Sequence, residues 1–155
     1  YYMDAIKRDG IPYELISKAL PTVEGAVNDI LAQIVDFSMI LEMDGKNINC
    51  YIVYDDDNVW PLELSSGMER FISSLAMRVG LVNVSNLPAA NFLAIDEGWG
   101  TMDSDNLNSV YSLFQYLKSQ FQFALIVSHI DSMRDAVDTL LEIKKEKSFS
   151  SINFD

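Results

Sequence analysis

Two stretches of this chain are apolar at every position, residues 92–95 and residues 123–127. Such runs are typical of strands that are buried on both faces of a parallel sheet. The segment between them predicts a helix, because its apolar residues recur at helical spacing. These residues are Leu107, Val110, Tyr111, Phe114 and Leu117. A strand, a helix and a second strand in this order predict a right-handed parallel crossover of an α/β fold.

The first half of the chain predicts two helices around an antiparallel strand pair. Pro21 stands where the first turn of a helix accepts proline, whereas Gly10 and Pro12 are expected to break any long helix within residues 1–20. Strands are expected at 38–43 and 49–54, with a turn between them. The second helix is predicted by an S-x-x-E capping box and by one apolar face. Its apolar residues are Met68, Phe71, Ile72, Leu75, Ala76 and Val79.

Two adjacent acids, Asp96 and Glu97, end the first all-apolar strand. Buried acids are costly unless a cation or a proton donor faces them. Nucleotide hydrolases use such a pair, in which one carboxylate holds Mg²⁺ and the other orients or deprotonates the attacking water. By itself the pattern fits a strand that ends at the surface with two solvated acids equally well.

Two further features place candidate chemistry near this strand. His129 follows the second all-apolar strand, and ligands of open α/β sheets bind at the carboxyl ends of the strands. If the strands are neighbours, Asp96, Glu97 and His129 face one cleft. The start of the capped helix, around Ser66, would offer N–H groups to a phosphate, although the capping box alone also explains this serine. A short helix at 132–137 and strands at about 139–143 and 148–154 complete the pattern.

Composition narrows the class of protein. With 155 residues, 49% of them hydrophobic and 22% charged, the chain is expected to be one globular domain or most of one. It begins with Tyr1, so we expect a piece of a longer protein. The net charge of -12 argues against a broad nucleic-acid-binding face. The basic residues at 144–147 and the acidic residues at 55–58 are expected to form solvated turns. The single Cys50 excludes an internal disulfide and fits a reducing compartment, and no run is long enough to span a membrane.

Taken together, the motifs resemble a known family. Residues 64–69 (LSSGME) resemble the L-S-G-G signature of ABC-type ATPases. Residues 92–97 resemble a Walker B strand, and residues 98–103 resemble the D-loop that follows it. Ser128-His129 resembles the switch-histidine loop. The sequence of residues 96–103 (DEGWGTMD) is similar to the corresponding segment in the SbcC branch of the SMC-like ATPases. These ATPases serve in double-strand-break repair nuclease complexes. The segments Gly10-Ile11-Pro12 and Ala19-Leu20-Pro21 resemble the return of the SbcC coiled coil to its head. The resemblance thus implies a coiled-coil return at 1–20 and a globular lobe at 21–155.

The implied fold is the C-terminal lobe of an ABC-type P-loop NTPase head, an α/β fold with a small antiparallel strand pair. The chain has no Walker A loop, since its only Gly-Lys pair, Gly45-Lys46, lacks the required spacing. In the family that loop lies in an N-terminal lobe, so the isolated chain is expected to be inactive. The signature departs from the family at Ser66, where glycine is usual, and at Met68, where Glu or Gln is common.

The resemblance also implies roles and partners. Asp96 would hold Mg²⁺, and Glu97 and His129 would be catalytic. The signature would cap ATP bound to the opposite head, and Asp103 would reach across that interface. The signature residues are Leu64, Ser65, Ser66, Gly67 and Met68. The implied partners are the Walker A lobe, a second copy of the head, an SbcD-like nuclease and DNA. The resemblance implies a cytoplasmic localisation at the nucleoid, or in the host cytoplasm if the protein is viral.

Two alternatives stay open at this point. The chain could be a dimerisation or nuclease-docking module that does not turn over ATP. It could also be the head lobe of another ABC ATPase, such as an SMC or RecF relative, although the D-loop wording and Gly10-Ile11-Pro12 argue against this.

Overall fold

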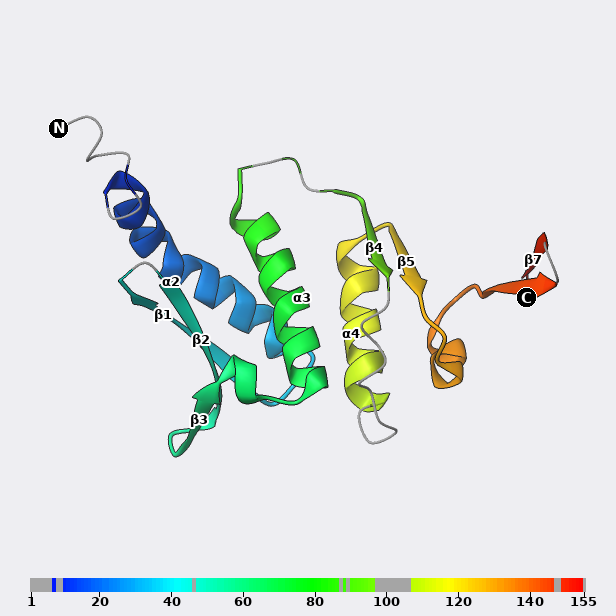
Figure 1. Cartoon of the computed structure of the whole chain (residues 1–155), viewed down its shortest axis with the longest axis horizontal. Coiled ribbons are helices and arrows are strands. Elements are labelled where there is room, and N and C mark those ends of the chain that lie inside the picture. The colour runs from blue at the N-terminus through cyan, green and yellow to red at the C-terminus, as the bar shows by residue number, and fades with distance from the viewer. Residues whose placement is uncertain are drawn as a thin grey trace. The chain divides into compact units, whose positions relative to one another are not determined.

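The computed structural model describes residues 7, 10–45, 47–86, 88, 90–96, 107–146 and 149–154 (Figure 1). The chain divides into two compact units, Tyr1–Asn91 and Phe92–Asp155, and each is described by itself. Within the described ranges, the structure contains no helix with the length and apolar character that a membrane crossing requires.

The first unit packs two helices with a three-stranded antiparallel sheet of order β1-β2-β3. Its elements are α2 (Ile11–Leu31), β1 (Ser38–Asp44), β2 (Asn47–Asp55), β3 (Asn58–Pro61), the 3-10 helix η1 (Leu62–Leu64) and α3 (Gly67–Val84). The α3 face predicted from the sequence is confirmed, since all its residues are buried except the half-buried Phe71. α2 and α3 approach closely at Gly80, where a Cβ atom would lie 3.0 Å from the Cγ2 atom of Val27.

The expected start of the first helix at Pro21 is wrong. α2 begins at Ile11, with Pro12 in its first turn, where a missing N–H costs nothing because it would have no acceptor within the helix. Pro21 lies inside the helix and removes one backbone hydrogen bond. The helix continues past it because its C-terminal half buries Val27, Ile30 and Leu31. Packing therefore outweighs the local preference of proline.

Side chains of α2 also cover the free edge of the sheet. Asn28 accepts a hydrogen bond from the backbone N–H of Met39 (2.8 Å) and donates one to the carbonyl of the same residue (2.9 Å). One turn earlier, Glu24 accepts a hydrogen bond from the N–H of Leu41 (2.7 Å). These contacts satisfy backbone groups of an edge strand that would otherwise lack partners.

The predicted strand pair is confirmed, with both strands slightly longer than expected. Gly45, with φ of +58°, supplies the left-handed conformation that the turn between them requires. The acidic segment at 55–58 does form a turn, in which Asp55 accepts hydrogen bonds from the backbone N–H of Asp57 and the side chain of Asn58. β3 follows this turn and was not predicted, because it is short and ends in Pro61.

The second unit contains β4 (Phe92–Asp96), α4 (Leu107–Gln120), β5 (Phe123–Val127), the 3-10 helix η3 (Asp131–Ala136), β6 (Leu141–Glu146) and β7 (Phe149–Phe154). β4 and β5 pair in parallel, as the sequence predicts, and β6 and β7 form an antiparallel pair. The short helix expected at 132–137 is a 3-10 helix.

The expectation that β4 and β5 are buried on both faces is wrong. Exposed positions alternate with half-buried ones along both strands, and Phe92 and Phe123 are 61% and 59% exposed. Among the described residues this sheet has two strands, and α4 lies beside it (Figure 1). One apolar face of the sheet is therefore left uncovered within this unit.

The buried face of α4 differs slightly from the predicted one. Val110, Phe114 and Leu117 are buried as expected, whereas Tyr111 is 42% exposed. Leu113 and Tyr116 are buried in addition. Leu113 lies three residues after Val110, and Tyr116 lies three residues after Leu113, so the buried face is wider than expected on the side away from Tyr111.

Candidate functional site

The carboxyl ends of β4 and β5 meet at one edge of the parallel pair. Asp96, the last residue of β4, is in register with Val127, the last residue of β5. His129 follows two residues later, and both Asp96 and His129 are exposed. The prediction that the two strands are neighbours is confirmed, and it brings this acid and this histidine to the same edge. Glu97, Asp103 and the rest of 97–106 lie outside the described residues.

The loop that carries His129 is fixed from one side by Ser128. The Oγ atom of Ser128 accepts a hydrogen bond from the N–H of Ile130 (3.1 Å). The same hydroxyl donates to the sulfur of Met133 (3.3 Å), whose side chain is buried. This pair of contacts ties the backbone on both sides of His129 to η3.

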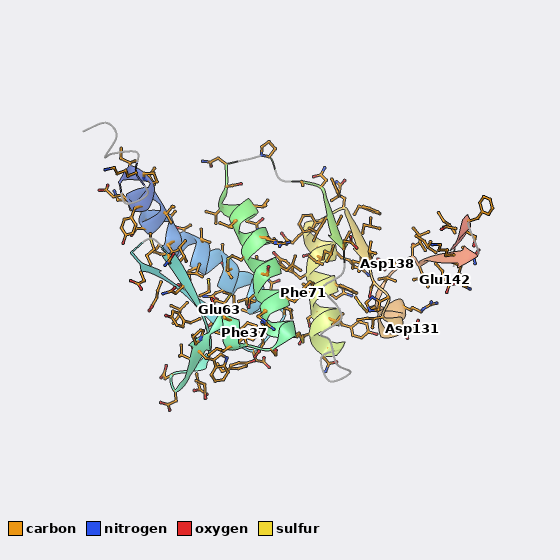
Figure 2. The ribbon with its side chains drawn as sticks, in the orientation of Figure 1. Phe37, Glu63, Phe71, Asp131, Asp138 and Glu142 are labelled. Atoms are coloured by element: carbon orange, nitrogen blue, oxygen red, sulfur yellow. The ribbon has the colours of Figure 1, made fainter. Side chains whose placement is uncertain are left out.

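Ion pairs hold the segment that follows the histidine loop. Arg134 of η3 pairs with Asp131 (3.1 Å) and with Glu142 of β6 (3.0 Å), and Glu142 also accepts from Lys144 (2.9 Å). The donors on Glu142, first Lys144 and then Arg134, lower the pKa of its carboxyl. Figure 2 shows Asp131, Asp138 and Glu142 around η3 and the start of β6. Residues 144 and 145 of the basic cluster thus belong to strand β6 and do not form the expected solvated turn.

The start of α3, in the first unit, has the predicted capping box. Ser66 is the N-cap, and its Oγ atom accepts a hydrogen bond from the N–H of Glu69 (3.3 Å). In return, Oε2 of Glu69 accepts a hydrogen bond from the N–H of Ser66 (2.5 Å). Two of the N–H groups at this helix start therefore have partners within the motif.

The five signature residues differ in their exposure. The side chains of Leu64 and Ser66 are exposed, and Gly67 is half-buried. Ser65 is only 8% exposed, and its hydroxyl donates inward to the carbonyl of Leu62 (2.7 Å). Met68 is buried in the core. Ser66 is consequently the signature serine whose hydroxyl faces solvent.

Sequence reasoning missed Tyr54 of β2, whose hydroxyl donates to Oε1 of Glu69 (2.5 Å). This contact joins two residues 15 positions apart, so no local spacing could have revealed it. The capping glutamate is thereby bonded both to its helix and to the sheet.

The described residues contain no group of three or more His, Cys, Asp or Glu side chains that could hold a metal ion. Asp96 alone fits Mg²⁺ all the same, because Mg²⁺ in nucleotide sites is bound by one or two carboxylates, with water and phosphate oxygens as the other ligands.

The sequence of this chain is similar to those of known proteins. The chain is 32% identical over 116 residues to the SbcC component of the SbcCD nuclease of Staphylococcus aureus, a match that covers 72% of this chain and 11% of the bacterial protein. It is also 33% identical over 168 residues to the uncharacterized protein R555 of Acanthamoeba polyphaga mimivirus. This match covers 98% of this chain and 12% of the viral protein. The chain is homologous to SbcC.

The fold of this SbcC homologue is similar to that of solved SMC structures. It matches a structure from work on "ATP-driven dimerization and DNA stimulated activation of SMC ATPases" with a TM-score of 0.74 at 15% identity, over 91% of this chain and 88% of that chain. It matches the SMC head domain from Thermotoga maritima with a TM-score of 0.63 at 20% identity, over 91% and 50% of the two chains. The predicted fold, that of an ABC-type ATPase head lobe, is confirmed.

This SbcC homologue spans about one tenth of the length of the curated relatives that it matches. No family model matches its sequence.

Proposed function

We propose that this chain is the C-terminal lobe of the ATP-binding head of an SbcC-like DNA-repair ATPase. In such a protein, ATP-driven pairing of two heads controls a partner nuclease at DNA ends. The observation that carries this proposal is the parallel pair of β4 and β5, which brings Asp96 and His129 to one edge. The capped signature helix α3, upstream in the same chain, supports it.

Each residue at this edge would have a distinct part in ATP hydrolysis. Asp96 would hold Mg²⁺ through water, and the ion would neutralise charge on the phosphates. Glu97 accepts a proton from the attacking water as the water oxygen bonds to the γ-phosphorus. The bond from that phosphorus to the bridging oxygen breaks, which releases ADP. His129 contacts the γ-phosphate and the same water.

The signature would act on the nucleotide of a second copy of the head. Ser66 would contact that nucleotide through its exposed hydroxyl, whereas the buried side chains of Ser65 and Met68 leave only their backbone for the contact. Asp103 reaches across the interface and links the two sites. Catalysis then depends on positioning by two heads, each of which supplies half of a site.

The phosphate-binding loop belongs, in this proposal, to an N-terminal Walker A lobe of the same protein. The uncovered face of β4 and β5 supports such a partner, because parallel sheets are normally covered on both faces. That face carries Phe92, Phe123, Leu125 and Val127, all exposed. The nuclease and DNA join the complete assembly, which acts in the cytoplasm, at a nucleoid or in the host of a virus.

The test is the substitution Glu97→Gln in the full-length protein. We expect ATP hydrolysis to fall roughly a hundredfold to ten-thousandfold, which is the usual contribution of a general base. Head dimers should accumulate with ATP, because the nucleotide that joins them is no longer consumed. Glu42→Gln is the matched control, since Glu42 is exposed on β1 in the other unit and should leave both measurements unchanged.

The outcomes separate the candidate functions. A wild-type protein that forms ATP-dependent dimers without measurable hydrolysis would be a dimerisation or nuclease-docking module. If Glu97→Gln traps no dimers and leaves hydrolysis unchanged, the catalytic assignment is wrong.

A further inference from the structure

Tyr54, on strand β2 of the first unit, contacts Glu69, whose carboxylate caps the start of α3. Its hydroxyl donates to Oε1 of Glu69 (2.5 Å), and Oε2 of the same carboxylate accepts from the N–H of Ser66. Both carboxylate oxygens are therefore held, one by β2 and one by the helix start. Such charge-assisted hydrogen bonds are stronger than neutral ones.

The ring of Tyr54 is itself held in place. Its centroid lies 5.6 Å from that of Phe37 and 5.7 Å from that of Trp60, in tilted arrangements that aromatic pairs favour. Phe37 is buried and Trp60 half-buried, so two anchored rings flank the tyrosine. Although Tyr54 is 43% exposed, these ring contacts reduce the side-chain entropy that its hydroxyl loses when it meets the carboxylate.

The position of this carboxylate matters for a helix start that caps a phosphate. Glu69 carries a negative charge within the first turn of α3, next to Ser66. A negative charge at a helix start favours the helix but repels a phosphate brought to the same place. The donors left for a phosphate are the Ser66 hydroxyl and the N–H groups of Gly67 and Met68, which have no acceptor within the helix.

We propose that Tyr54 is a positioning residue of the signature, which restrains the Glu69 carboxylate and so keeps its charge from opposing the nucleotide that α3 caps on the partner head. This inference rests on the proposed function. It means that the sheet, through Tyr54, affects the ATP concentration at which two heads dimerise. The pKa of Tyr54 is raised to about 12 by partial burial and by the hydrogen bond to Glu69, which agrees with this contact.

The test compares Tyr54→Phe with Tyr51→Phe in the full-length protein. Both variants remove one hydroxyl from β2 and keep the ring, but the described hydrogen bond to the Glu69 carboxylate belongs to Tyr54. For Tyr54→Phe we expect the ATP concentration at half-maximal head dimerisation to rise about tenfold, the scale set by a hydrogen bond to a charged group. Turnover at saturating ATP should be unchanged, as should both values for Tyr51→Phe.

A second background separates positioning from simple stability. Glu69→Gln removes the charge, so adding Tyr54→Phe to it should no longer alter dimerisation, although the loss of thermal stability from the missing hydrogen bond should persist. A wild-type protein that does not dimerise with ATP contradicts the proposed function itself. If the wild type dimerises and Tyr54→Phe behaves like Tyr51→Phe, or retains its full effect in the Glu69→Gln background, the role of Tyr54 is refuted.

Discussion

Tyr54 and Glu69 form a pair in which each partner favours one protonation state of the other. Partial burial raises the pKa of Tyr54, and the hydrogen bond to Glu69 and the charge of that carboxylate raise it further, to about 12. Partial burial would also raise the pKa of Glu69, but the hydrogen bonds from Ser66 and Tyr54 outweigh it and lower that pKa. The contact is strongest between a neutral phenol and an ionised carboxylate.

This pair predicts how stability depends on pH. The pKa of Tyr54 is above its unfolded value of about 10, so its stabilisation is complete below that pH and is lost as the pH rises toward 12. The pKa of Glu69 is lowered, so its stabilisation is present above the ordinary glutamate pKa and is lost as the pH falls below it. The measurement is the free energy of unfolding of the wild type minus that of Tyr54→Phe across pH. A difference that stays constant through both ends of the range would contradict the contact.

Single residues also show what the sequence can predict of a site. Asp96 and His129 follow directly from strands with a strong apolar pattern, and parallel neighbours place such strand ends together. Tyr54 has no comparable signal, because its meeting with Glu69 depends on how β2 packs near the start of α3. The hydrogen bond from the Ser65 hydroxyl to the carbonyl of Leu62 depends likewise on the 3-10 helix η1. No spacing of apolar residues predicts this short helix.

Between elements, Asn28 links α2 to the edge strand β1 through two hydrogen bonds with the backbone of Met39. For Asn28→Ala we expect a loss of roughly 2–4 kcal/mol in the free energy of unfolding, because two backbone groups of Met39 lose their partner in a partly buried place. Urea unfolding of the 155-residue chain, followed by circular dichroism, measures the change.

Gln33→Ala provides the control for this substitution. The Gln33 side chain makes one exposed hydrogen bond to the carbonyl of Asp29 within the same helical region. Its loss should change the free energy of unfolding by less than about 0.5 kcal/mol. Equal effects of the two substitutions would show that the edge contacts of Asn28 add nothing to the packing of α2.

The elements that the sequence predicted correctly are those with regular apolar patterns, such as the helix α3 and the strand β4. α2 was placed ten residues too late because a proline within a helix is rare, and only tertiary packing of Val27 and Leu31 explains why it is tolerated. β3 was missed because four residues ending in proline carry too little pattern. The exposure of β4 could not be foreseen, since an apolar run predicts a strand but does not show what covers its faces.

For the chain as a whole, the uncovered face of β4 and β5 and the missing Walker A loop lead to one expectation. The purified 155-residue chain should neither bind ATP tightly nor hydrolyse it, because its sequence contains no G-x-x-x-x-G-K-[ST] loop to bind the phosphates. Isothermal titration with ATP and Mg²⁺ and a phosphate-release assay test this, with the full-length protein measured alongside. Adding the separately produced Walker A lobe should restore binding and bury the apolar face that includes Phe92 and Phe123, which hydrogen exchange at β5 would report as slower exchange. Turnover by the isolated chain would instead mean that a complete phosphate site lies within these residues, and the division of the head into two complementary lobes would then be wrong.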